Sequence, residues 1–253
     1  MRAEGHTPSV AVISAFKDVG EDVFAVVQSV QSQSYQNVQH YIVEGGGSME
    51  SRALLKGPCS MPNTHCVIEP DKGIGDAWNK GVSRCKEDLV VFLGAGDRLE
   101  PTNVERAVRL YESMNRPENV IIAGICMREH ADGSVRRDAR KYHRLWRPIS
   151  LRVWFPTCFI PRRLLEAVGP FSLEKKIAVD SDWLLRAIAR GATFAYGGHL
   201  IRMDATGVSE RLWARGYLEY FQSLEAQGLL TPYDQLVSWI YRAVKRISGH
   251  EFS

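Results

Sequence analysis

The first half of the chain alternates between short apolar runs and longer segments whose apolar residues recur every three or four positions. Runs such as LVVFL at 89–93 consist of β-forming residues, as expected of a strand that is covered on both faces. The longer segments have the period of helices that bury one face. Together they predict strands at 10–14, 38–43, 65–69, 89–93 and 120–127, and helices at 22–31, 74–84 and 104–114.

This order of elements indicates the fold class. Repeated strand-then-helix units favour a largely parallel, doubly wound α/β sheet. The turn ADGS at 131–134 predicts a hairpin, and the basic stretch from Arg136 to Arg147 then breaks the pattern. That stretch has two interpretations, a solvated basic loop or a lid that closes over a ligand. Beyond it the pattern predicts helices at 164–168, 183–190, 210–225 and 233–247, and a strand at 199–203.

Composition narrows the classes of protein. With 253 residues the chain can bury the core of one large domain, and its net charge of +3 is too small to indicate nucleic-acid binding. No apolar stretch approaches the ~20 residues of a membrane span, and residues 1–8 lack the apolar segment of a signal peptide, so the cytoplasm is the expected compartment. The five cysteines form no C-x-x-C pair, and we expect reduced, mostly buried thiols.

Two predicted strands end in glycine-rich polar segments. The strand at 89–93 continues into GAGD, which places Asp97 at a carboxyl end, where open α/β sheets collect ligands. The strand at 38–43 continues into Glu44 and three glycines, a turn that lets the backbone approach a ligand but is as often purely structural. The pattern G-x-G-x-x-G is absent after the first strand, which removes the main support for a nicotinamide site.

Four segments in sequence resemble the nucleotide-sugar-dependent glycosyltransferases of family 2, in particular the bacterial enzymes that build surface polysaccharides and cell-envelope glycolipids. They read SVAVISAF, QSQSYQNVQHYIVEGGGS, EPDKGIGDAWNKG and FLGAGD, and the resemblance covers about residues 9–210. It implies the GT-A fold, a Rossmann-like doubly wound α/β sheet with helical acceptor-side additions. It also implies transfer of a sugar from a nucleoside-diphosphate sugar, in the first place a UDP-sugar, to a hydroxyl of a polysaccharide or lipid-linked glycan.

The resemblance also divides the chain. Residues 1–8 are expected to form a disordered tail, and 9–230 one GT-A domain with a nucleotide-sugar-binding half (9–128) and an acceptor-side half (129–230). Residues 231–253 predict an amphipathic helix, with Leu236 and Ile240 on an apolar face and Arg242 among its cationic neighbours. This helix has two interpretations: it contacts the inner face of the cytoplasmic membrane peripherally, or it packs onto the domain.

A donor site follows from matching the family's motifs position by position. Asp97 matches the last acidic residue of the metal motif, for Mn²⁺ or Mg²⁺. The family usually has two acidic residues there, whereas this chain has Gly96; Mg²⁺ needs only one or two carboxylates plus substrate phosphates. Glu44 matches the carboxylate that binds uracil, usually an aspartate, and Met49 stands where a second acidic residue is common. The implied donor-binding residues are Ser14, Ala15, Phe16, Glu44, Asp71, Lys72, Gly73, Asp76, Asn79, Lys80, Gly94, Ala95 and Gly96.

The second half supplies a catalytic base. The segment KIAVDSDW at 176–183 resembles the family's segment before an acceptor-side helix, and Asp180 falls on the position that removes the proton of the acceptor hydroxyl. Asp182 is the competing choice, and capping of the following helix explains either residue without catalysis. The implied mechanism is direct displacement with inversion at the anomeric carbon. A catalytically silent relative that binds a nucleotide sugar or a partner enzyme is the alternative.

Overall fold

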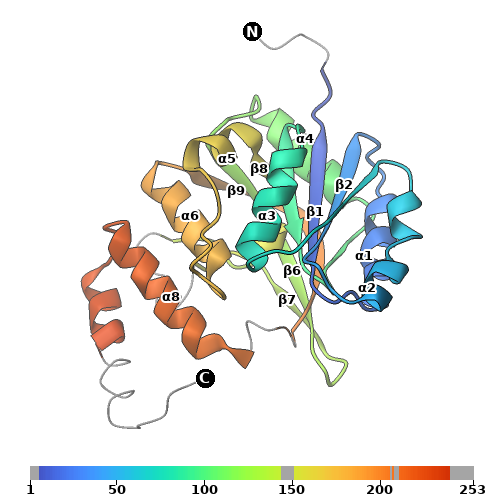
Figure 1. Ribbon diagram of the computed structural model, residues 1–253. Coiled ribbons are helices and arrows are strands. Elements are labelled where there is room, and N and C mark those ends of the chain that lie inside the picture. Colours follow the sequence, from blue (N-terminus) through green and yellow to red (C-terminus); the bar gives the residue numbers. More distant parts are fainter. Residues whose placement is uncertain (1–5, 144–150, 206, 208–210, 240–253) are drawn as a thin grey trace.

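The computed structural model describes residues 6–143, 151–205, 207 and 211–239 (Figure 1). Its first sheet has the strand order β3-β2-β1-β4-β8. The first four strands run parallel and only the short edge strand β8 is antiparallel, which confirms the predicted largely parallel sheet. The bounds are β1 Val10–Phe16, β2 Val38–Glu44, β3 Thr64–Ile68, β4 Leu89–Leu93 and β8 Ile160–Pro161.

A second sheet of four strands has the order β5-β9-β6-β7. Strands β6 and β9 run parallel, and β6 and β7 form the hairpin predicted around the ADGS turn. Residues 159–161 join the two sheets, because Ile160 pairs with β4 and Phe159 bridges to β6. The bounds are β5 Arg98–Leu99, β6 Val120–Glu129, β7 Val135–Asp138 and β9 Thr193–Asp204.

Helices cover both faces of the first sheet, so alternate residues of β1 enter different cores. Ile13 packs in one core with α3 and α6, and Val12 packs in the other with α1 and α4. Figure 1 shows α3 crossing one face, with α6 and α8 to one side of it. The helices are α1 Asp22–Gln31, α2 Met49–Leu54, α3 Ile74–Arg84, α4 Asn103–Ser113, α5 Arg162–Val168, α6 Val179–Ala189 and α8 Trp213–Ala226, with 3-10 turns at Pro58–Ser60 and Phe155–Thr157.

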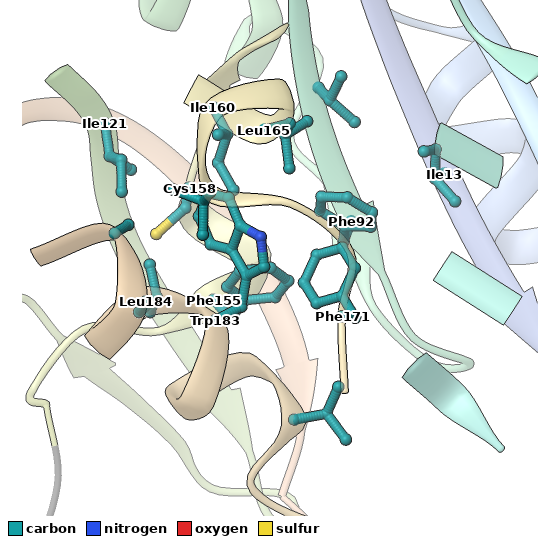
Figure 2. Close-up of a cluster of buried hydrophobic side chains, with 14 of the residues drawn as sticks. Ile13, Phe92, Ile121, Phe155, Cys158, Ile160, Leu165, Phe171, Trp183 and Leu184 are labelled. Carbon is teal, nitrogen blue, oxygen red and sulfur yellow. The ribbon is translucent and has the colours of Figure 1, made fainter. Parts of the chain in front are cut away.

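An aromatic core fixes helix α6 against the first sheet (Figure 2). Phe92 of β4 lies 5.3 Å from Phe155 and 5.1 Å from Phe171 between ring centroids, and Phe171 lies 5.7 Å from Trp183 of α6. Trp183 is fully buried and donates its indole N–H to the Gly169 carbonyl at 3.0 Å. Trp78 packs against the same rings. Both tryptophans therefore belong to the core, as their helical spacing favours.

The expectation of five reduced cysteines is wrong at one pair. Cys59 and Cys66 form a disulfide, since the 3-10 turn at Pro58–Ser60 packs beside β3 and brings the two Cα atoms to 5.7 Å. A separation of seven residues outside any C-x-x-C pattern gave no sign of this contact. The other three cysteines are free and buried, as predicted.

The two ends of the described chain differ in how they are held. At the start, the Pro8 carbonyl accepts a hydrogen bond from Tyr35 and His6 lies 2.8 Å from Asp88, so residues 6–8 contact the domain. At the other end, residues 232–239 are helical, with Leu236 and Trp239 exposed, and the rest of the predicted C-terminal helix lies outside the described residues. None of the helices in the described ranges has the length and apolar character needed to cross a membrane.

Candidate active site

The strand order of the first sheet places a crevice outside β1 and β4. The chain proceeds from β1 to β2 to β3 in one direction and then returns to place β4 on the other side of β1, so the topology switches between these strands. The GAGD loop follows β4 at this point. Asp97 turns back into it, with Oδ2 accepting from the Gly94 N–H at 2.7 Å, and only 6% of the residue is exposed.

Burial and a neighbouring carboxylate make Asp97 a weak acid. Burial raises its pKa from 3.8 to about 7; the Gly94 N–H lowers it, Asp204 raises it, and Arg98 lowers it again. The carboxyl group therefore changes its charge near neutral pH, and a bound cation would favour its charged form.

Asp204 is a neighbour of Asp97 that the sequence analysis missed. It ends β9, and the pairing of β5 with β9 sets Arg98 opposite Arg202. Gly96 has φ +88°, and a Cβ at position 96 would lie 3.3 Å from the Cβ of Asp204. The side chain of Asp204 thus lies beside Gly96, the position at which the resemblance implies a second acidic residue. Asp204 follows the predicted strand at 199–203 directly, and a single aspartate there gave no sign of this contact, which depends on the pairing of β5 with β9.

The glycine turn after β2 is organised by Glu44. Its carboxylate accepts from the N–H groups of Gly46, at 3.1 Å, and Gly47, and the residue is fully buried. A Cβ on Gly47 would clash with Glu44, so the turn needs glycine there. The predicted base-reading carboxylate therefore lies within the turn and is hydrogen-bonded to its backbone.

The loop before α3 is held by its own side chains. Asp71 Oδ1 accepts from the Gly73 N–H at 2.9 Å, and Asp76 Oδ2 accepts from the Lys72 N–H at 3.0 Å. Lys80 Nζ lies 3.6 Å from Asp76, one helical turn earlier, and donates to the Pro70 carbonyl of the preceding loop at 2.5 Å. Asp71 also packs so closely on Gly45 that a Cβ there would clash. The structure therefore brings this loop and the glycine turn after β2 together.

Other predicted donor residues have internal roles. Ser14 is fully buried and lies 2.9 Å from His40 Nε2; burial lowers the pKa of His40 to about 3 and keeps it neutral. Ala15 and Phe16 are buried in opposite cores. Asn79 makes two hydrogen bonds with the backbone of Phe171, at 2.8 and 3.0 Å, and so ties α3 to the segment before α6. Ser14 is the β1 partner of Leu93, the residue before the GAGD loop, so the end of β1 lies beside this loop.

Asp180 lines a cavity of about 280 Å³ between the 151–156 segment, α6 and α8. Burial raises the pKa of Asp180, opposed by hydrogen bonds that include one from the Ser181 N–H at 2.6 Å. A raised pKa makes its carboxylate a better proton acceptor than an exposed aspartate. The lining residues are Arg140, Leu151, Arg152, Val153, Trp154, Phe155, Pro156, Ile177, Ala178, Asp180, Ser181, Met203, Trp213, Gly216, Tyr217 and Tyr220.

Asp182, the competing base, points into the protein. One carboxylate oxygen lies 3.0 Å from Arg186 Nε, the other accepts from the Ser223 hydroxyl at 2.7 Å, and the residue is only 8% exposed. These contacts join α6 to α8, and Asp182 does not line the Asp180 cavity. The placement favours Asp180 as the residue that meets an acceptor.

Glu219 of α8 holds the segment that leads into Asp180. Its buried carboxylate accepts from the backbone N–H groups of Lys176, Ile177 and Ala178 at 2.8–3.1 Å and pairs with Arg215 Nε at 3.0 Å. Burial alone would raise the pKa of Glu219, but these hydrogen bonds outweigh it and lower the pKa. The carboxylate satisfies N–H groups at the start of α6, where negative charge is favoured. It lies 39 positions away from Asp180 in sequence, so no motif showed it.

Comparisons with known proteins agree with this architecture. Residues 11–166 match the sequence profile described as "Glycosyl transferase family 2". The chain belongs to glycosyltransferase family 2. An uncharacterized glycosyltransferase of Mycobacterium tuberculosis is 27% identical over 209 residues, covering 79% of this chain and 77% of that protein. A PGL/p-HBAD biosynthesis glycosyltransferase of the same species is 21% identical, covering 77% and 75%.

Solved structures show the same fold. TarS residues 1–349 of S. aureus, in complex with UDP, superposes with a TM-score of 0.63 at 12% identity, covering 88% of this chain and 66% of that one. A longer TarS chain of S. aureus superposes with a TM-score of 0.59, and this family 2 chain covers 39% of it. The predicted family and the GT-A fold are thereby confirmed.

Replacing Glu219 with glutamine should destabilise the protein, because it weakens the hydrogen bonds that hold residues 176–178 before Asp180. An amide keeps one acceptor oxygen but loses the charge, so the free energy of unfolding should fall by about 1.5–3 kcal/mol. Because the pKa of Glu219 is lowered in the folded state, its stabilising effect is present above the unfolded pKa and lost as pH falls. Urea unfolding at pH 7.5 and pH 4 should therefore show a larger difference from the native protein at pH 7.5. Glu174→Gln, the same chemical change at an exposed glutamate, is the matched control.

Proposed function

We propose that this family 2 chain is a metal-dependent inverting glycosyltransferase. It moves a sugar from a UDP-sugar to a hydroxyl of a polysaccharide or lipid-linked glycan during cell-envelope glycan synthesis. The name of the mycobacterial PGL/p-HBAD relative and the UDP bound by TarS support the acceptor class and the nucleotide. The observation that carries the proposal is the placement of two carboxylates: Asp97 at the carboxyl end of β4, and Asp180 in a separate cavity beside α6.

The donor side would hold a divalent cation, Mn²⁺ or Mg²⁺. No cluster of three or more potential metal ligands occurs within the described ranges. Asp97 and Asp204 nevertheless suit such an ion, because burial and mutual repulsion leave Asp97 in need of positive charge. Two carboxylates plus substrate phosphates are a sufficient ligand set for Mg²⁺. When bound, the ion supplies fixed positive charge to the departing diphosphate.

The acceptor side would supply the base. Asp180 accepts the proton of the acceptor hydroxyl as its oxygen attacks the anomeric carbon. The bond from that carbon to the diphosphate oxygen breaks on the opposite face, which inverts the configuration. The raised pKa of Asp180 makes its carboxylate a stronger base for this step than an exposed aspartate.

A catalytically silent relative that binds a nucleotide sugar or a partner enzyme is the second candidate. The complete burial of Glu44 favours it, because both carboxylate oxygens of Glu44 already serve the glycine turn. The position of Asp180 on a cavity wall favours the enzyme.

Donor hydrolysis separates the two candidates. Purified protein is incubated with a panel of UDP-, GDP- and dTDP-sugars with Mn²⁺, Mg²⁺ or EDTA, and released nucleoside diphosphate is measured. The enzyme should release it from one donor only with a divalent ion. Glu118→Gln, which removes an exposed carboxylate paired with Arg163 near the amino end of β6, should leave the rate unchanged. Donor binding without release in every condition, including with lipid-extract acceptors, would support the silent relative.

A further inference from the structure

Arg152 is a cation of the Asp180 cavity with no ion pair or hydrogen bond to another described residue. Its neighbour in the lining, Arg140, is different, because its Nε lies 2.7 Å from an Asp138 carboxylate oxygen. Asp180 is the only carboxylate among the lining residues that the structure describes. The cavity therefore presents one guanidinium group whose hydrogen-bonding capacity the described part of the protein leaves unused.

The backbone at Arg152 adds a second observation. Its φ is +57°, in the left-handed region that residues with a side chain, other than Asn and Asp, rarely adopt. Strained residues of this kind persist where the surroundings hold them, and they cluster at ligand sites. This backbone conformation determines the direction in which the Arg152 side chain leaves the segment 151–156, which lines the cavity.

Aromatic side chains form much of the remaining lining. The Trp154 ring has the guanidinium groups of Arg128 and Arg140 at 5.0 and 5.2 Å from its centroid. Trp213 of α8 is 52% exposed and lies 5.4 Å from Tyr217. Flat aromatic faces suit a ring with an apolar face, and a guanidinium suits a phosphate or carboxylate, which it binds through two parallel hydrogen bonds.

We infer that the acceptor carries an anionic group, a phosphate or carboxylate, beside the ring that bears the reactive hydroxyl, and that Arg152 binds this group. The inference rests on the proposed function, because it takes the Asp180 cavity as the acceptor site. The aromatic walls hold the ring and Asp180 faces its hydroxyl. Arg152 is thus a specificity-determining residue that selects charged acceptors over neutral ones.

The donor diphosphate is the other anion of the reaction, and the cavity walls argue against it as the partner of Arg152. No residue of the GAGD loop lines the cavity. The two sites are neighbours through β9, where Met203 lines the cavity and the next residue, Asp204, packs on Gly96. Arg152 lies instead on the wall built from 151–156, α6 and α8.

Binding of simple probes tests the inference without turnover. Affinities for glucose, glucose 6-phosphate, glucuronate and inorganic phosphate are measured by ligand-observed NMR in the presence of UDP and Mn²⁺. The native protein should bind glucose 6-phosphate or glucuronate at least tenfold more tightly than glucose or inorganic phosphate. Arg152→Asn should abolish this preference, since asparagine tolerates the left-handed backbone but lacks the guanidinium. Arg109→Ala, at an exposed arginine of α4, should preserve it.

Three results would overturn the inference. The first is an equal affinity of the native protein for charged and neutral sugars, and the second is a preference that survives in Arg152→Asn. The third is a tenfold loss of UDP affinity in Arg152→Asn with the sugar preference intact, which would assign Arg152 to the donor. None of these readouts requires donor hydrolysis, so a failure of the proposed activity would be recognised separately.

Discussion

Replacing Asp180 with asparagine is expected to lower kcat for sugar transfer by about 10²–10⁴-fold, the usual contribution of a positioned general base. The amide has nearly the same shape but cannot accept the proton. Donor affinity should be unchanged, because Asp180 lies in the cavity beside α6 and not on the GAGD loop. Steady-state transfer kinetics and donor binding by calorimetry measure the two quantities separately.

The pH dependence of the native enzyme gives an independent check on Asp180. Burial raises the pKa of this carboxyl, and the base acts only when deprotonated. The rate should therefore rise with pH through a pKa above the ordinary aspartate value of 3.8. Asp182→Asn should instead lower stability, because Asp182 binds Arg186 and Ser223 between α6 and α8. A larger loss of kcat in a folded Asp182→Asn than in Asp180→Asn would reverse the assignment.

Replacing Asp97 with asparagine should have opposite effects on activity and stability. Metal-stimulated release of nucleoside diphosphate should fall by at least about 10²-fold, since a catalytic cation contributes several kcal/mol of charge stabilisation. The metal-free variant should nevertheless be more heat-stable than the native protein at pH 8. The native carboxyl has a folded pKa of about 7 against 3.8 unfolded, so its ionisation costs stability as pH rises between these values.

Thermal unfolding in EDTA at several pH values tests the expected direction of this stability difference. The advantage of Asp97→Asn over the native protein should grow from pH 4 to pH 7 and then level off. An advantage that shrinks with rising pH would show that Asp97 is stabilised as a charged group in the metal-free protein. Calorimetric titration with Mn²⁺ should show weaker binding to both Asp97→Asn and Asp204→Asn, which tests the second carboxylate without an activity assay.

The local pattern of the sequence predicted most of the first sheet and its helices. The ends of α1, α3 and β4 agree with the predicted bounds. A helix that buries one face has apolar residues at every third or fourth position, and a fully buried strand is a continuous apolar run. Helix α6 begins at Val179, four residues before the predicted start, so both Asp180 and Asp182 lie in its first turn. The strands β5 and β8 were not predicted, because each has only two residues, too few to show an alternation of apolar and polar positions.

Residues of the candidate site could be predicted only where they belong to one continuous sequence motif. The GAGD loop and the segment before α6 are continuous motifs, so Asp97 and Asp180 could be named in advance. Asp204, Glu219 and Arg152 come from three other segments, and long-range packing alone brings them to the site. Ser14 and Asn79 match motif positions, but the motifs gave no sign of their hydrogen bonds to His40 and to the backbone of Phe171.

The anomeric configuration of the product tests the central claim most directly. With the donor identified by hydrolysis and an acceptor in hand, NMR of the transferred sugar reports whether the configuration at its anomeric carbon has changed. Direct displacement with Asp180 as the only base predicts inversion, so an α-linked donor gives a β-linked product. Retention of configuration would contradict this mechanism and the role of Asp180 as the base.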